Sequence, residues 1–162
     1  MQFGRFRIGL RTLKTAMAVM LIIAVYYCFN RPPFVAALAA VFALRENWDK
    51  TLSFAKIRLI SNTVGGLLAL VYFLIYTQTD HADWVAIIIL PLLVIITIVF
   101  LDGFNFNSGV IGALAALLMI ALNIPAGATV VYVIDRIADT FVGVLVAIGV
   151  NRFASPQTKK KA

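Results

Sequence analysis

The sequence has few of the residues on which most enzymes and metalloproteins depend. Among 162 residues there are one cysteine, Cys28, and one histidine, His81. A single cysteine excludes an intrachain disulfide, and one histidine with one cysteine cannot supply the ligands of a structural metal site. We find no triad arrangement for nucleophilic catalysis and no phosphate-binding loop. The sequence therefore predicts that the protein is not an enzyme and holds no metal ion or soluble cofactor.

Charged residues are also scarce. Only 13% of the residues are charged and 62% are hydrophobic, whereas a soluble domain has roughly 25% charged and roughly 45–50% apolar residues. A soluble domain of this length lacks the interior to bury so many apolar side chains. The composition excludes a soluble enzyme and a nucleic-acid-binding domain, and it predicts that a lipid bilayer surrounds much of the chain.

Six apolar segments are separated by polar or proline-containing turns. We expect helices at about 8–29, 34–44, 57–76, 84–101, 109–122 and 130–153. The second and fifth segments are short: as helices they would rise only about 16 and 21 Å, and the hydrocarbon core of a bilayer is about 30 Å thick. Pro91 predicts a kink in the fourth segment. The predicted fold class is all-α, a polytopic membrane bundle with six transmembrane segments.

Basic residues gather at alternate ends of these segments. Twelve of the 14 lysines and arginines lie near the N-terminus, between residues 45 and 58, or after residue 151. If all six segments cross the membrane, these three clusters share the cytoplasmic side, as the positive-inside rule requires. We therefore expect one transmembrane domain at 1–154, a short basic cytoplasmic tail at 155–162, and both termini in the cytoplasm. The first span is interpreted as uncleaved, with Lys14 as a snorkelling anchor.

The two halves of the domain, about 8–76 and 84–153, resemble each other. Five residues of the third segment recur 78 positions later in the sixth: Arg58, Val64, Gly65, Leu67 and Ala69 correspond to Arg136, Val142, Gly143, Leu145 and Ala147. The alanine-rich second and fifth segments match loosely. Three crossings in each half would invert the halves in the membrane. This plan is common in secondary transporters, in which short segments mark the substrate site.

Charges within the last segment are the clearest indication of function. Asp135, Arg136 and Asp139 lie in an apolar segment, where charged side chains usually face the bundle interior or a water-filled cavity. We interpret Arg136 as a group that binds an anionic substrate through its forked guanidinium. Asp135 or Asp139 would then carry a coupling proton. The alternative interpretation is a structural ion pair near the membrane interface.

The third segment offers a related set of polar residues. Arg58 is interpreted as a cation at the inner mouth of a transport path, or alternatively as a positive-inside anchor. Asn62 and Thr63, about one turn deeper, would add hydrogen bonds to a polar solute. Four small residues are interpreted as sites of close helix packing, between the third and sixth segments: Gly65, Ala69, Gly143 and Ala147.

Four stretches of the chain carry a family resemblance. They are Gly9–Ala18, Pro33–Val41, Lys56–Gly66, and Asp135–Gly143 together with Asn151. The set resembles the membrane domains of the aromatic acid exporter and fusaric acid resistance (FUSC-like) family. The resemblance implies proton-driven export of small organic anions, such as aromatic carboxylates, across the plasma membrane of a bacterium.

The resemblance also implies an assembly. The larger relatives carry additional domains, so if this domain is the minimal unit we expect a homo-oligomer. Two alternative functions fit the same sequence features: a passive membrane channel, and a non-transporting scaffold or partner subunit of another membrane protein.

Overall fold

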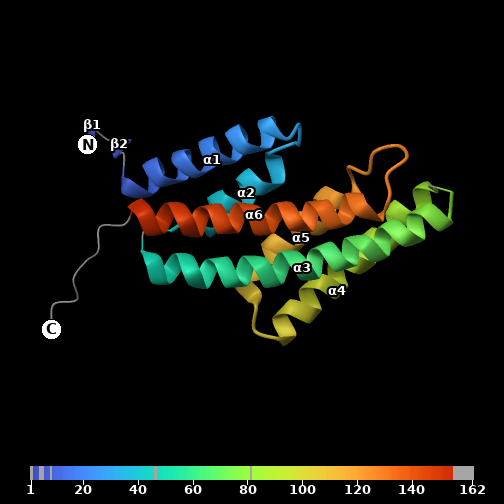
Figure 1. Ribbon diagram of the computed structural model, residues 1–162. Coiled ribbons are helices and arrows are strands. Elements are labelled where there is room, and N and C mark those ends of the chain that lie inside the picture. Colours follow the sequence, from blue (N-terminus) through green and yellow to red (C-terminus); the bar gives the residue numbers. More distant parts are fainter. Residues whose placement is uncertain (1, 4–5, 8, 46, 81, 155–162) are drawn as a thin grey trace. The chain divides into compact units, whose positions relative to one another are not determined.

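The computed structural model describes residues 2–3, 6–7, 9–45, 47–80 and 82–154. Within these residues the regular secondary structure is helical apart from an antiparallel pair of two-residue strands, β1 (Gln2–Phe3) and β2 (Phe6–Arg7). The main helices, labelled in Figure 1, are α1 (Leu10–Cys28), α2 (Phe34–Ala43), α3 (Trp48–Gln78), α4 (Leu90–Gly103), α5 (Val110–Ala121) and α6 (Val130–Ala154). The all-α prediction is confirmed, and the tail predicted at 155–162 lies outside the described residues.

The third helix begins earlier than its apolar segment. We expected a helix from about residue 57, but α3 starts at Trp48. Asp49 lies in its first turn, where a negative charge interacts favourably with the helix macrodipole. The expected boundary marked the start of the apolar run, whereas the helix continues through the polar residues that precede it.

The predicted disturbance at Pro91 takes the form of a change in helix type. A π-helix spans Val85–Ile89, directly before α4, and Pro91 occupies the first turn of α4. Proline has no backbone N–H and its ring clashes with the carbonyl one turn earlier. A wider π turn at this point accommodates the proline while the chain stays helical.

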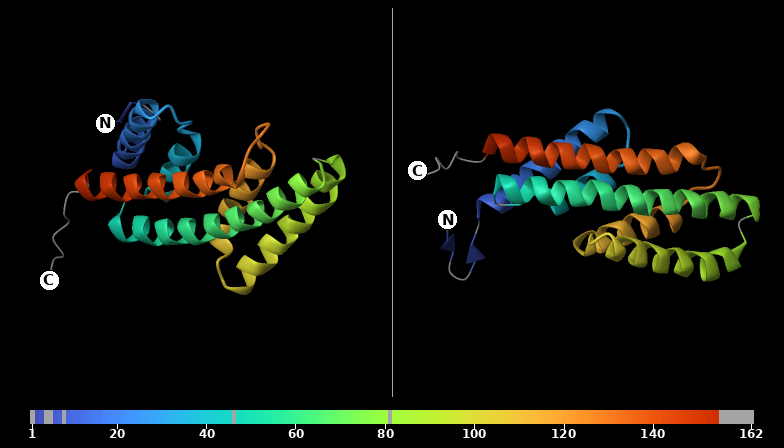
Figure 2. Two further views of the ribbon diagram at one scale, coloured as in Figure 1. Left: turned by 45° about the vertical axis from the view of Figure 1, so that its right-hand side comes forward. Right: turned by 90° about the horizontal axis from the view of Figure 1, so that it is seen from below.

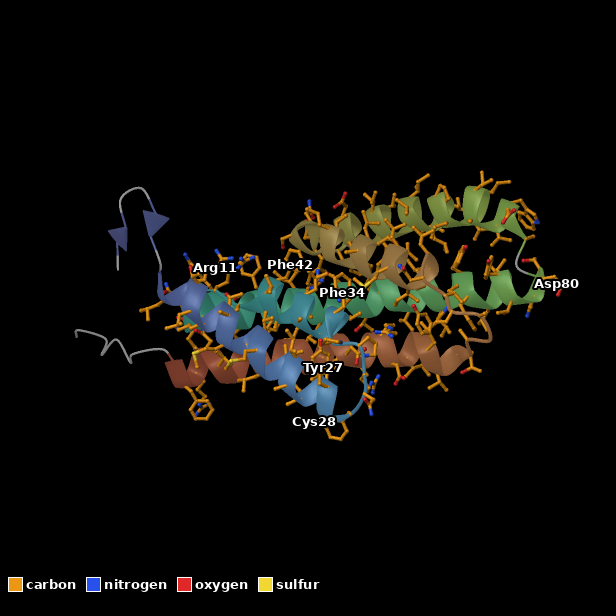
Figure 3. All side chains as sticks on the ribbon, turned by 90° about the horizontal axis from the view of Figure 1, so that it is seen from above. Arg11, Tyr27, Cys28, Phe34, Phe42 and Asp80 are labelled. Atoms are coloured by element: carbon orange, nitrogen blue, oxygen red, sulfur yellow. The ribbon has the colours of Figure 1, made fainter. Side chains whose placement is uncertain are left out.

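Three helices are each followed, two residues after their last residue, by a residue with a left-handed backbone. The φ angles are 50° at Asn30, 49° at Asp80 and 59° at Asn105. Asparagine and aspartate tolerate this region better than other residues with a side chain. Asp80, labelled in Figure 3, marks the turn that follows α3.

The chain divides into two compact units. Among the described residues, the first comprises those up to Lys56 and from Phe141 onward, and the second comprises those from Ile57 to Thr140. Helices α1 and α2 pair in the first unit, and α4 and α5 pair in the second (Figures 1 and 2). Each unit therefore contains one helix pair together with a part of α3 and a part of α6.

The two units have different interiors. In the first, one face of α1 is buried at four-residue intervals, at Lys14, Ala18, Ile22 and Tyr26. In the second, large apolar side chains form a cluster that includes Tyr72, Phe73, Leu90, Leu93, Leu117, Ile120 and Val133. Each unit thus buries a charged side chain, Lys14 in the first and Asp139 in the second, and the second also contains this large apolar cluster.

Three of the described helical segments are long and apolar enough to cross a membrane: Leu10–Cys28, Trp48–Gln78 and Val85–Gly103. The shorter apolar segments are Phe34–Ala43 and Asn107–Ala121. Six crossings and an inverted repeat stay predictions.

Candidate functional site

In the second unit, α3 presents two faces to neighbouring helices. Gly65 lies against the backbone carbonyl of Ala113 in α5, and Gly66 lies against the side chain of Ile137 in α6. A Cβ atom at either glycine would collide with these groups. Glycine at both positions therefore allows α5 and α6 to approach α3 closely.

The 3₁₀ turn Asn107–Gly109 and the beginning of α5 cover a polar edge of α3. Gly109 lies directly against Ser61 Oγ. A Cβ atom placed on Gly112 would lie 2.5 Å from Arg58 Nη1 and 3.5 Å from Asn62 Oδ1. The two glycines thus let the α5 backbone pass over three polar side chains of α3. We call Arg58, Ser61 and Asn62 the α3 polar cluster.

The sequence analysis identified Arg58 and Asn62 but not Ser61, Gly109 or Gly112. The spacing of Gly109 and Gly112 could have indicated this contact. Two glycines three residues apart lie on the same face of a helical turn, and neither carries a side chain there. Ser61 is one turn after Arg58 on the same face of α3. That spacing could have added Ser61 to the site.

Asn62 connects α3 to α6. Its Nδ2 donates to Thr140 Oγ1 at 3.0 Å, and the Thr140 hydroxyl donates to the Arg136 carbonyl at 3.4 Å. Because the single hydroxyl proton of Thr140 is committed to Arg136, the Thr140 oxygen accepts the amide N–H of Asn62. The amide orientation of Asn62 is thereby fixed, and Oδ1 is the end left for another partner.

In the α3 polar cluster, the side-chain oxygen atoms of Ser61 and Asn62 are buried without hydrogen bonds among the described residues. Ser61 is 0% exposed and Asn62 is 4% exposed. Ser61 Oγ and Asn62 Oδ1 have no hydrogen-bond partner in the part of the chain that the structure describes. Leaving such an atom unsatisfied costs about 1–3 kcal/mol. Ligand or water atoms that bond to them would remove this cost.

Arg136 and Asp139 form an ion pair on α6. Nη1 of Arg136 lies 3.4 Å from Oδ2 of Asp139, and the Arg136 guanidinium lies 5.2 Å from the ring centroid of Tyr132. Asp139 is 2% exposed, whereas the Arg136 side chain is 19% exposed. The contact is longer than the 2.7–2.9 Å typical of charge-assisted hydrogen bonds. Asp135, one turn earlier, is partly buried.

The remaining predicted polar residue, Thr63, bonds to its own helix. Its hydroxyl donates to the Leu59 carbonyl at 2.8 Å. The Thr63 oxygen keeps acceptor capacity. Its role in substrate binding stays a prediction.

The predicted small-residue contacts involve the short helices. Gly65 meets the Ala113 carbonyl of α5, and in the first unit Gly143 of α6 meets the Ala36 carbonyl of α2. Ala69 and Ala147 are each 0% exposed. We expected packing between the third and sixth segments. The structure instead places each of these glycines against the backbone of a short, alanine-rich helix.

The interpretation of Lys14 as a snorkelling anchor is wrong. Lys14 is 2% exposed, and its Nζ donates to Asn151 Oδ1 at 2.9 Å. Asn151 Nδ2 donates to Thr51 Oγ1 at 2.8 Å, and Thr51 Oγ1 accepts the Arg45 N–H and donates to the Arg45 carbonyl. An amide oxygen 137 positions away in the sequence gives the ammonium a partner inside the first unit. We call Lys14, Asn151 and Thr51 the α1 polar network.

Comparison with known proteins gave one match. A family model described as aromatic acid exporter family member 1 matches residues 6–154. No curated protein and no solved structure matches the chain. The matched range contains all the helices described above, together with the α3 polar cluster and the Arg136–Asp139 pair.

Proposed function

Because the chain belongs to the aromatic acid exporter family, we propose that it exports small organic anions, such as aromatic carboxylates, across the plasma membrane of a bacterium. Family membership and three apolar helices of spanning length support a role in membrane export. The substrate, the coupling to protons, the two cytoplasmic termini and a homo-oligomeric assembly belong to the proposal.

The α3 polar cluster is the observation that carries this proposal. It places a half-buried guanidinium, that of Arg58, beside buried oxygen atoms of Ser61 and Asn62 that lack hydrogen bonds in the described residues. The forked N–H donors of Arg58 match a carboxylate, and the Ser61 hydroxyl can donate to the same group. Asn62 Oδ1 accepts hydrogen bonds, so it would hold a water molecule beside the anion.

The Arg136–Asp139 pair supplies a way to couple export to protons. A substrate carboxylate competes with Asp139 for the Arg136 guanidinium, because both are anions and the existing contact of 3.4 Å is long. A buried carboxylate that loses its cation becomes neutral by taking up a proton. Asp139 is our first candidate for the coupling group, and Asp135, one turn away, is the second.

We also propose six spans built as two inverted halves. Two pairs of contacts support this. Gly65 and Gly143, 78 positions apart, each meet the carbonyl of an alanine in a short helix. Asn62 and Thr140 are also 78 positions apart, and they bond to each other. A residue can meet its own repeat counterpart only near a two-fold axis.

The substrate role of Arg136 is tested by export from proteoliposomes. The Arg136→Ala variant should lose transport of benzoate while keeping its fold, because the guanidinium that attracts the carboxylate is gone. Arg152→Ala is the matched control, since Arg152 lies on the same helix and is exposed. Wild-type transport by Arg136→Ala would remove the role assigned to this residue.

The coupling role of Asp139 is tested in the same vesicles with an imposed pH gradient. We expect Asp139→Asn to transport benzoate down its concentration gradient without responding to the pH gradient, because an amide cannot take up the proton. If the wild-type flux ignores the pH gradient and follows only the solute gradient, the protein is a passive channel. If the purified wild type moves no solute, the scaffold alternative is favoured.

A further inference from the structure

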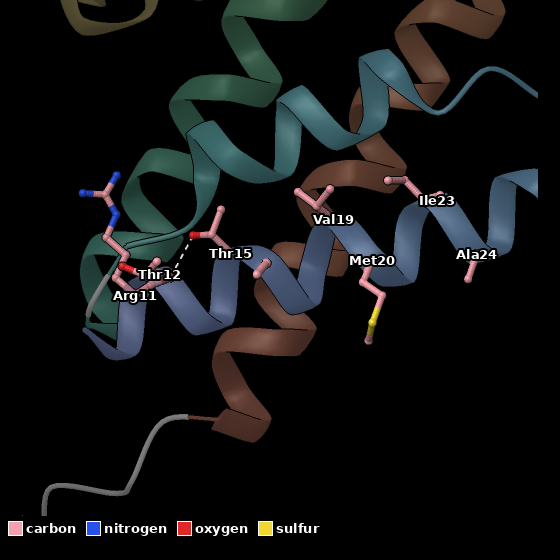
Figure 4. Close-up of a pocket in the computed structure, with 8 residues that line it drawn as sticks. Arg11, Thr12, Thr15, Val19, Met20, Ile23 and Ala24 are labelled. Atoms are coloured by element: carbon pink, nitrogen blue, oxygen red, sulfur yellow. Dashed lines mark hydrogen bonds between the residues drawn. The ribbon is translucent and has the colours of Figure 1, made fainter. Parts of the chain in front are cut away.

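A groove of about 860 Å³ runs along α1 in the first unit (Figure 4). Its lining residues are Arg11, Thr12, Thr15, Ala16, Val19, Met20, Ile23 and Ala24. They recur as neighbouring pairs every four residues, and from first to last they cover about 20 Å of helix. The groove is thus a continuous strip along most of α1.

The groove changes character along its length. Its N-terminal end is polar, with the exposed guanidinium of Arg11 beside Thr12 and Thr15. The Thr15 hydroxyl donates to the Arg11 carbonyl at 2.8 Å, the bond drawn in Figure 4. Beyond this end, the lining from Ala16 to Ala24 is wholly apolar and covers about 12 Å. Half of a bilayer's hydrocarbon core measures about 15 Å.

A second guanidinium lies near the polar end. Burial and the positive charge of Arg11 lower the pKa of Arg45, which lies between α2 and α3. Arg45 stacks with its Cζ 4.0 Å from the ring centroid of Phe54. Its Nε is buried without a hydrogen-bond partner among the described residues. A phosphate between the two arginines would relieve their repulsion.

We propose that this groove binds one anionic phospholipid, with its phosphate between Arg11 and Arg45 and an acyl chain along the strip from Ala16 to Ala24. Arginine recognises phosphate through two parallel hydrogen bonds. The charged end continues directly into an apolar strip on a helix of spanning length. A lipid has both parts, whereas a free phosphate would leave the apolar strip unused.

The test is a titration of the purified full chain with lipid, read by native mass spectrometry. We expect phosphatidylglycerol to bind more tightly than phosphatidylcholine with the same acyl chains. Arg11→Gln and Arg45→Gln should each weaken phosphatidylglycerol binding by about tenfold, the size of one charge-assisted hydrogen bond, and leave phosphatidylcholine binding unchanged. Arg152→Gln is the control, because it removes the same charge from an exposed residue that stacks over Trp48 in the same unit.

A second variant tests the apolar part. Ala24→Trp should fill the strip and weaken binding of both lipids severalfold without changing the mass of the assembly. Three outcomes would overturn the proposal. If Arg11→Gln and Arg152→Gln lose phosphatidylglycerol binding equally, the selectivity depends on net charge and not on this groove. Displacement of the lipid by inorganic phosphate would indicate a free-anion site. A change of oligomeric mass in Ala24→Trp with lipid binding intact would indicate that a second copy of the chain occupies the groove.

This inference is independent of the transport proposal. Neither Arg11 nor Arg45 belongs to the α3 polar cluster or to the Arg136–Asp139 pair. Loss of lipid selectivity in Arg11→Gln with benzoate export retained would support the lipid site and leave the proposed function untouched. Loss of export in Arg136→Ala with lipid selectivity retained would support the transport site alone.

Discussion

The two compact units both bury polar side chains of α3 and α6, but the hydrogen bonding differs between them. In the first unit, the α1 polar network continues from the Lys14 ammonium through Asn151 and Thr51 to the backbone of Arg45. In the second unit, Asn62 bonds to Thr140, while Ser61 Oγ and Asn62 Oδ1 have no partner within the described chain. A satisfied network stabilises a fold, whereas unsatisfied atoms cost stability and are retained where a ligand completes them.

The proposed repeat offers one way to interpret this difference. Asn151 of the α1 polar network and Phe73 of the apolar cluster lie 78 positions apart, and they are 0% and 3% exposed. Corresponding positions therefore hold an amide in one unit and an aromatic ring in the other. If the halves are inverted copies, the α1 polar network belongs to only one of them. We infer that it is a structural specialisation of the first unit, whereas the proposed substrate-binding residues lie in the second.

The largest expected effect is at Asn151. Asn151→Leu removes the acceptor of the buried Lys14 ammonium and a donor to Thr51, so we expect the free energy of unfolding to fall by about 3 kcal/mol. Reversible unfolding in mixed micelles measures this. Lys14→Met, which removes the charge together with the need to satisfy it, should cost less than Asn151→Leu. If Asn151→Leu lowers the free energy of unfolding by less than Lys14→Met does, the network does not stabilise the first unit.

The close helix contacts give the next largest effect, and they compare the units directly. Alanine at Gly65 or at Gly143 places a Cβ against a backbone carbonyl of a short helix. We expect each change to lower the free energy of unfolding by about 1–3 kcal/mol, because the backbone of the neighbouring helix cannot move aside as a flexible side chain can. Gly103→Ala is the control, since nothing lies within 4 Å of its Cβ position. Losses that differ by more than about 1 kcal/mol would argue against equivalent contacts in the two units.

The sequence predicted the helices well because the signals are local. Apolar runs and their turns predicted the helices close to their observed limits, except at the start of α3, where polar residues from Trp48 onward continue the helix. Arg58 and Asn62 could be proposed together because they are one turn apart on the same helix. Both signals depend on residues close together in the chain.

The contacts that sequence reasoning missed are long-range. Whether Lys14 reaches the lipid headgroups or stays buried depends on Asn151, which is 137 positions away. The burial of Ser61 depends on Gly109, which lies in another helix. Neither distance follows from periodicity or charge. Only the proposed repeat offered partial guidance, because it would pair Asn62 with Thr140, 78 positions later.

Two buried hydroxyls, Thr51 in the first unit and Ser61 in the second, give the smallest expected effects on stability and compare the units directly. Thr51→Ala removes a hydroxyl that bonds to Asn151 and to the Arg45 backbone, and we expect it to cost about 1–2 kcal/mol in the free energy of unfolding. Ser61→Ala removes a hydroxyl as deeply buried, but one without a protein partner in the described residues, so we expect it to leave the free energy of unfolding unchanged or to raise it. The same unfolding measurement in mixed micelles compares both variants.

The two variants should rank in the opposite order when benzoate export is measured, with the larger loss in Ser61→Ala. Ser61→Ala takes away a donor to the substrate carboxylate and should reduce the initial rate severalfold, whereas Thr51→Ala should export at the wild-type rate at temperatures where it is folded. Equal destabilisation by the two variants would mean that Ser61 has a structural partner, and the contrast between the units would fail. A stable Ser61→Ala variant with wild-type export would keep the contrast in hydrogen bonding but remove Ser61 from the substrate site.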